Sequence, residues 1–216
     1  MKKILLALLS FLLFTSTTLN AQIKKGATFL GGDVGVSISE TTNSTNTGDE
    51  QNGIQVLPVL GKAVKDNLVV GAYLIYNSFK SDVYIDANDI EQKIFGGGLF
   101  VRKYKQLGKG DFSVFLQGRV GYEHENLKTG ENTTNGGESN GSIVSMGLYP
   151  GISYSLNKKI QIETGFNNIL AMRYQYRKGY SGAILPVTFR SSRFDVYSSL
   201  ENLSSLYVGF RLLLNK

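Results

Sequence analysis

Residues 112–122 read FSVFLQGRVGY, a run in which apolar and polar side chains take turns. Successive side chains of a strand point to opposite faces, so this alternation predicts a β-strand with one apolar and one polar face. The apolar face would carry Phe112, Val114, Leu116, Val120 and Tyr122. The polar face would carry Ser113, Gln117, Arg119 and, just beyond the run, Glu123.

Seven other segments show strand-like patterns of the same kind. They are residues 28–38, 53–64, 68–78, 94–104, 142–156, 160–175 and 203–214. Three short turns, at 65–67, 106–110 and 157–159, each join an even-numbered expected strand to the next odd-numbered one. Long polar segments at 40–52, 80–92, 126–141 and 177–202 therefore all fall at the opposite end of the strands.

Strands of about ten residues, short turns at one rim and long loops at the other are typical of a membrane barrel. The sequence therefore predicts an all-β protein, an eight-stranded antiparallel up-and-down transmembrane β-barrel. A soluble eight-stranded barrel of the lipocalin type, with its apolar face turned inward, is the alternative. The unequal loop lengths and the polar opposite faces favour the membrane barrel.

The first 21 residues have the layout of a secretory signal peptide. Lys2 and Lys3 precede an apolar run at 4–14, which is too short to span a bilayer as a helix. We expect residues 22–216 to form one barrel domain. The absence of cysteine excludes a lipid-anchored lipoprotein, disulfide bonds and thiolate metal sites. The formal charge of +6 comes from scattered basic residues, so nucleic acid is not an expected partner.

Three motifs resemble those of the small outer-membrane β-barrel family, the OmpA-like and OmpX-like eight-stranded barrels. They are LPVLGKAVKDNLVVG at 57–71, VRKY at 101–104 and YPGISY at 149–154. The last strand is also similar to the signal read by the barrel-assembly machinery, with Gly209, Leu212 and Leu214 in matching places, although Asn215 and Lys216 follow. The resemblance implies the outer membrane of a Gram-negative cell, with contacts to outer-membrane lipid, lipopolysaccharide and the assembly machinery.

Eight strands leave an interior just wide enough for side chains to fill. The residues expected to form a lumenal polar network are Arg102, Gln117, Arg119, Gln161, Glu163 and Arg211, with Asp33 as a further candidate. An unpaired charge there would be costly, so we predict an ion pair of Glu163 with Arg119 or Arg211. Such a network would either simply fill the barrel or gate a narrow ion path by rearranging.

Catalysis would have to involve His124, the one histidine, which stands beside Glu123 and Glu125. A lipid deacylase also needs a serine within reach of it, and Ser142 and Ser145 are the candidates on the adjacent strand. No sequence pattern places either serine there, so we expect no catalytic residues, no cofactor and no metal site. Five tyrosines near strand ends are candidates for aromatic girdles: Tyr76, Tyr122, Tyr149, Tyr174 and Tyr207.

We therefore expect an outer-membrane barrel with a structural or surface-interaction role and no open pore. The alternatives are a narrow channel, a transporter of apolar ligands and a lipid-modifying barrel enzyme. The long loops would carry the contacts of any extracellular partner. Within the last of them, residues 183–189 and 194–197 could extend the barrel as a protruding sheet whose edge recruits a partner strand.

Overall fold

The computed structural model describes residues 23–42, 48–82, 89–108, 110–130, 136–166, 169–181, 187–198 and 206–214. The expected signal peptide lies outside them. The described residues form ten antiparallel strands: β1 (Thr28–Thr42), β2 (Gly48–Lys65), β3 (Leu68–Asp82), β4 (Ile90–Gln106), β5 (Phe112–Thr129), β6 (Gly137–Ser155), β7 (Ile160–Phe166), β8 (Leu170–Ser181), β9 (Val187–Tyr197) and β10 (Leu206–Leu214). In this part of the chain no helix is long and apolar enough to cross a membrane.

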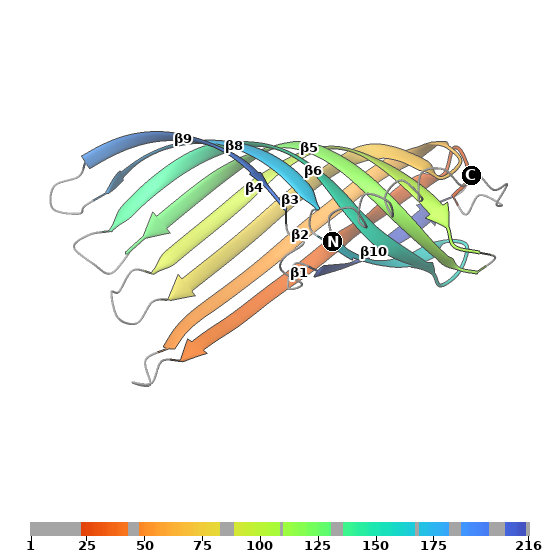
Figure 1. Cartoon of the computed structure of the whole chain (residues 1–216), viewed down its shortest axis with the longest axis horizontal. Helices are drawn as coiled ribbons and strands as arrows, with labels where there is room; N and C mark the ends of the chain where they lie inside the picture. Colours follow the sequence, from red (N-terminus) through yellow and green to blue (C-terminus); the bar gives the residue numbers. More distant parts are fainter. Residues whose placement is uncertain are drawn as a thin grey trace, which may run out of the picture.

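Near the short turns the sheet closes into a ring of eight strands. Neighbouring strands pair in sequence order from β1 to β7, then β7 pairs with β10 and β10 with β1. We call this part, which contains β7 and β10, the lower ring. The predicted fold class, an all-β eight-stranded up-and-down barrel, is confirmed by this pairing (Figure 1).

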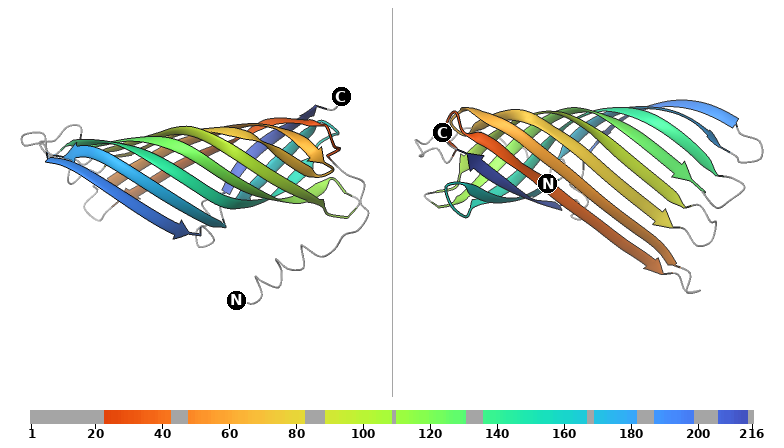
Figure 2. Two further views of the ribbon diagram at one scale, coloured as in Figure 1. Left: turned by 90° about the horizontal axis from the view of Figure 1, so that it is seen from above. Right: turned by 180° about the vertical axis from the view of Figure 1, so that it is seen from behind.

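Above the ring the seventh and eighth positions are taken by different strands. The end of β6 pairs with β7, while Gly137–Leu148 of β6 pair with β8, and β8 pairs with β9. We call this part, which contains β8 and β9, the upper sheet. Among the described residues, β1 has no second partner beyond Val34, and β9 has no partner other than β8. The two strands border the upper sheet on opposite sides (Figures 1 and 2).

The turn between β2 and β3 shows how local chemistry fixes the short-turn end. Asn67 adopts a positive φ of 59°, which asparagine tolerates better than most residues. Its side-chain Oδ1 accepts a hydrogen bond from the Ile23 backbone amide at 3.1 Å, and its backbone amide donates to the Ile23 carbonyl at 2.9 Å. The segment before β1 is therefore tied across the end of the barrel.

The strands run further from the short turns than predicted. Segments expected as loops begin or end in paired strand, so that β5 continues to Thr129 and β2 starts at Gly48. The backbone pairing continues through segments in which both faces of the strand are polar. Such segments lack the alternation of apolar and polar side chains from which the strands were predicted. Two segments, 183–189 and 194–197, were predicted as possible strand extensions. Residues 187–189 and 194–197 lie in β9, while 183–186 lie outside the described residues.

The outward faces form an apolar belt, with exposed aliphatic side chains on every strand from β1 to β6. Tyr76, Tyr122 and Tyr174 are exposed on these faces, as the girdle prediction requires. The prediction is wrong for Tyr149 and Tyr207, which have odd numbers on strands whose even residues face outward. Tyr207 is 5% exposed, and Tyr149 packs against the lumenal Arg119.

Candidate functional site: the lumenal polar network

The six predicted network residues all point into the barrel and are buried. Strand parity places them there: Gln117 and Arg119 share a face of β5, Gln161 and Glu163 share a face of β7, and Arg102 and Arg211 lie on β4 and β10. Asp33 of β1, the further candidate, is also buried. The strands that carry these residues are brought together by closure of the lower ring.

Glu163 lies at the centre of the network. Its Oε2 is 2.6 Å from Nη1 of Arg102 and 3.1 Å from Nη2 of Arg211. Its Oε1 accepts a hydrogen bond from the Tyr104 hydroxyl at 2.7 Å. Of the two expected partners of Glu163, the structure therefore places Arg211 beside it and not Arg119. Arg102, which was not predicted as a partner, makes the shorter contact.

Asp33 joins the remaining arginine to this centre. One oxygen of its carboxylate pairs with Arg211, and the other is 3.2 Å from Nη2 of Arg119. Arg211 also donates from Nη1 to the Gly32 carbonyl at 2.7 Å. Gln117 also belongs to the network, because its Oε1 accepts a hydrogen bond from Nε of Arg102 at 2.5 Å. Gln161 stands apart, donating to Ser155 Oγ at 3.2 Å.

Aromatic rings pack around the arginines, and the sequence reasoning missed them. The guanidinium carbon of Arg102 lies 4.2 Å from the ring centre of Phe115 and 5.3 Å from that of Phe29. Arg119 lies 4.3 Å from the ring centre of Tyr149. These faces attract a desolvated cation. Phe115 and Phe29 have odd numbers like the inward residues Gln117 of β5 and Asp33 of β1, so strand alternation is the signal that could have found them.

The network carries an excess of positive charge. Three arginines face two carboxylates, which gives a formal charge of +1. Several buried guanidinium nitrogens have no acceptor among the described residues, namely Arg102 Nη2, Arg119 Nε and Arg211 Nε. Cation–π contacts therefore supply part of the compensation that carboxylates do not.

Buried apolar side chains share the level of the network in the lower ring, since Val69 is the ladder partner of Arg102 and Leu57 that of Asp33. Phe29, Leu57 and Val69 are almost completely buried there and belong to one hydrophobic cluster. Close packing continues beyond Arg119 toward the upper sheet: the hydroxyl of Tyr73 lies over Gly121, where a Cβ atom would collide with it. Charged, apolar and aromatic side chains thus lie together inside the lower ring.

A third buried carboxylate, Glu125, was not assigned to the lumen by the sequence analysis. It is 0% exposed and accepts hydrogen bonds from Gln92, Gln175 and Arg177, while Nη2 of Arg173 lies 3.8 Å away as an ion-pair partner. Arg177 binds it with Nε at 2.5 Å and Nη2 at 2.8 Å. Its odd number on β5, shared with Gln117 and Arg119, was the signal that could have found it.

The candidate catalytic residues fall on different faces. His124 lies outward, beside the ring of Phe95 at a centroid distance of 5.2 Å. Ser142 is its cross-strand partner, but the Ser142 hydroxyl is hydrogen-bonded to Tyr122 at 2.8 Å. Ser145 lies inward and donates to Glu123 at 2.9 Å. Among the described residues, no three histidine or acidic side chains form a group that could hold a metal ion.

No family model matches the sequence, and no curated protein matches it. Several solved structures align with the fold. Neisserial surface protein A aligns with a TM-score of 0.43 and 14% identity, over 87% of this chain and 99% of that one. OprG from Pseudomonas aeruginosa gives 0.44 and 16%, over 91% and 100%. The translocator domain of the autotransporter NalP from Neisseria meningitidis gives 0.46 and 12%, over 90% and 64%.

Proposed function

We propose that this chain is an outer-membrane β-barrel protein with a structural or surface-interaction role, whose lower ring does not conduct. One observation carries the proposal: the network centred on Glu163 lies buried inside the lower ring, with Arg102 and Arg211 each 0% exposed. A solute crossing the ring would have to break buried ion pairs that hold their partners at 2.6 to 3.1 Å.

The membrane location is supported by the inversion of polarity. Leu74, Leu99 and Val208 are more than 60% exposed on the outer face, while arginines and carboxylates are buried inside. Burying charge while exposing aliphatic side chains would be unfavourable in water, but it suits a protein surrounded by lipid. The closed ring also satisfies the backbone groups of the ladder, which a membrane barrel requires.

Conductance in planar bilayers tests the proposal against the narrow-channel alternative. The refolded chain is expected to give no uniform conductance steps. The double variant Arg102→Ala/Glu163→Ala removes one charge of each sign together with much of the filling, and it is expected to conduct. A shift in gel mobility between boiled and unboiled samples verifies that both proteins are folded. Uniform steps from the unmodified chain would contradict a filled lumen.

The hairpin of β8 and β9 favours surface interaction over a purely structural role. Its β9 strand is exposed along nearly its whole length, and one edge has no partner among the described residues. Such an edge can pair with a strand of another protein. Deleting residues 183–197 is expected to abolish binding of cells to a partner surface while the barrel still assembles. Unchanged binding by the deletion variant would contradict this role.

A further inference from the structure

A groove crosses the strands on the outward face of the apolar belt, and we call it the belt groove. It has a volume of about 970 Å³ and is lined by three consecutive residues from each of β3, β4, β5, β6 and β8. In each strand the first and third of these residues face outward, so the groove lies between two rows of cross-strand partners. The row nearer the short turns consists of Val70, Val101, Gly118, Leu148 and Leu170.

Gly118 leaves a gap in this row that packing does not require. A Cβ atom at Gly118 would lie 3.5 Å from Cγ1 of Val101 and 3.9 Å from Cδ2 of Leu148, which are ordinary contacts. A Cβ atom at Gly71 or Gly98 would instead collide with a backbone oxygen. A side chain would therefore fit at position 118, and its absence opens the belt groove between Val101 and Leu148.

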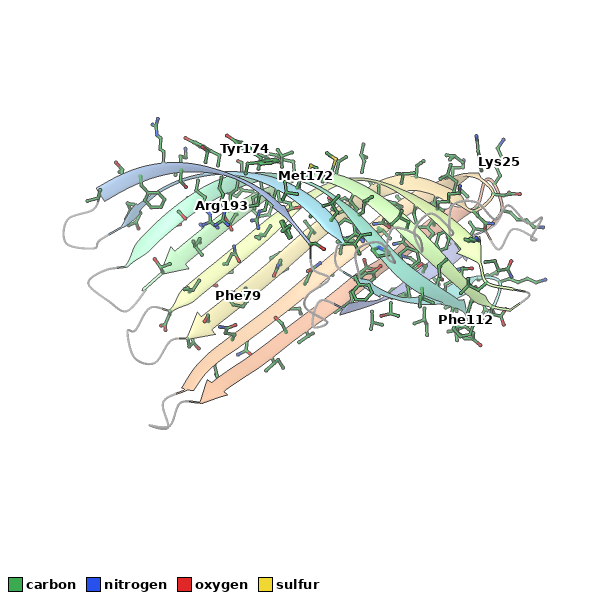
Figure 3. All side chains as sticks on the ribbon, in the orientation of Figure 1. Lys25, Phe79, Phe112, Met172, Tyr174 and Arg193 are labelled. Carbon is green, nitrogen blue, oxygen red and sulfur yellow. The ribbon has the colours of Figure 1, made fainter. Side chains whose placement is uncertain are left out.

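The second row contains the two methionines that follow the expected signal peptide. Met146 and Met172 are cross-strand partners and are 54% and 39% exposed. Figure 3 shows Met172 on the outer side of the sheet, away from the short-turn end that carries Lys25. Unbranched thioether side chains adapt to the shape of an apolar ligand. The belt groove therefore combines a gap with side chains that can close over an occupant.

The belt groove rises along the barrel from β3 to β8. Val70 is two residues beyond the start of β3 at Leu68, whereas Leu170 is ten residues beyond the start of β7 at Ile160. Four strand spacings of about 4.8 Å make the groove ~19 Å long. Strands of membrane barrels tilt by about 35–45°, so a groove that crosses them covers roughly 11–13 Å of membrane depth. One leaflet supplies about half of a hydrocarbon core of ~30 Å, so the groove suits an acyl chain of a single leaflet.

Two lysines lie at the low end of the belt groove. Lys62 of β2 is the cross-strand partner of Val70, and Lys103 of β4 is that of Leu68. Both lysines are exposed, and neither forms an ion pair with another described residue. Two strand spacings and a stagger of two residues put their Cα atoms roughly 12 Å apart, so both ammonium groups can approach one phosphate. The short turns of outer-membrane barrels face the periplasm, which places this pair at the headgroups of the periplasmic leaflet.

From the groove and the lysines, we propose that the protein holds one anionic phospholipid of the periplasmic leaflet, with an acyl chain in the belt groove and the phosphate between Lys62 and Lys103. Lysines at the edge of a belt often reach the interface without binding a particular lipid, but here an apolar groove begins beside them. Their two uncompensated charges favour a lipid of net negative charge over a zwitterionic one. This inference rests on the membrane location in the proposed function and adds a ligand site to it.

The test is native mass spectrometry of the refolded chain, with dioleoyl phosphatidylglycerol added to the detergent micelles. We expect one phosphatidylglycerol molecule to stay bound. Gly118→Leu fills the groove without a collision and should weaken this binding about tenfold or more, because the acyl chain loses the burial of several CH₂ groups. Val208→Leu is the matched control, since it enlarges an outward residue of β10 away from the groove and should leave binding unchanged.

Two comparisons examine the headgroup. The double variant Lys62→Gln/Lys103→Gln should bind phosphatidylglycerol about tenfold more weakly, because hydrogen bonds to charged groups are the stronger class. Lys178→Gln, which removes an exposed lysine at the long-loop end of β8, should bind it as the unmodified chain does. Dioleoyl phosphatidylcholine has the same chains without the net charge and should bind at least tenfold more weakly. Equal binding of the two lipids would overturn the role assigned to the lysines.

The heat-dependent gel shift separates failure of this site from failure of the proposed function. A chain that shows no shift after refolding into bilayers would contradict the membrane barrel itself. A chain that shows the shift but retains no phosphatidylglycerol would overturn the lipid site alone, and so would unchanged binding by folded Gly118→Leu. If cross-linking instead yields a dimer that Gly118→Leu abolishes, a second copy occupies the belt groove and the lipid assignment is wrong.

Discussion

Replacing Glu163 by glutamine tests the reasoning about the filled lumen most directly. The substitution keeps the size of the side chain and removes its charge. Two arginine contacts, at 2.6 and 3.1 Å, would lose their counter-charge, and the excess charge of the network would rise from one to two. The amide nitrogen of glutamine is a donor, so it cannot replace an oxygen that accepts from Arg102 or Tyr104.

The expected size of the effect follows from the burial of the pair. Removing one partner of a buried ion pair costs about 3–5 kcal/mol, because the other charge stays buried without compensation. With a urea dependence of ~2 kcal/mol/M, the midpoint of unfolding should fall by roughly 1.5–2.5 M. The chain has no tryptophan, so circular dichroism of the strands and the heat-dependent gel shift are suitable readouts.

Glu91→Gln is the matched control. Glu91 also pairs with a cation, Lys93, at 2.6 Å, but the lysine is half exposed. Such pairs contribute about 0–1 kcal/mol, so the midpoint should hardly move. The double variant Glu163→Gln/Arg102→Gln should regain part of the loss, since it removes one charge of each sign. If Glu163→Gln shifts the midpoint no more than Glu91→Gln does, the network does not stabilise the barrel.

Three other substitutions examine the belt, the turn and the interior. Val120→Arg places a charge on the outward face of β5, and it should destabilise the barrel in lipid bilayers by about 2–4 kcal/mol, measured by urea unfolding. Asn67→Val should cost about 1–2 kcal/mol because its positive φ is strained for a branched residue, whereas Asn67→Gly should keep the turn. Gly121→Val should collide with Tyr73 and lower the folded fraction on gels by overpacking, an effect of about 1–3 kcal/mol, and Tyr73→Ala in the same chain should restore folding.

Much of the lower ring could be predicted because its turns and its alternation of apolar and polar residues can be recognised within short stretches of sequence. The turn before Leu68 and the turn before Ile160 contain asparagine, and the predicted starts of both strands agree with the structure. The far ends could not be predicted in the same way. Beyond Tyr122, β5 continues through His124 and Asn126. Polar residues occupy both of its faces there, so the sequence shows no alternation between an apolar and a polar face.

The network shows a similar division between local and non-local information. Parity along each strand was enough to place Arg119 and Glu163 in the lumen. Their ion-pair partners depend on how far the strands are staggered around the ring, and this stagger cannot be deduced from the sequence of any one strand. Arg119 therefore pairs with Asp33 of β1, while Glu163 reaches Arg102 across the interior. The break between β7 and β8 was also missed, because residues 160–175 read as one alternating segment.

That break has a consequence for how the protein can evolve. Between the pairs Gly151↔Gly165 and Leu148↔Leu170, one side of the ladder has two residues and the other has four, and Pro150 stands on the shorter side. Proline cannot donate to a ladder, so it tolerates this change of register. Insertions and exchanges in β8 and β9 therefore need not propagate into the lower ring. Changes in the hairpin leave the pairs of β7 with β6 and β10 as they are.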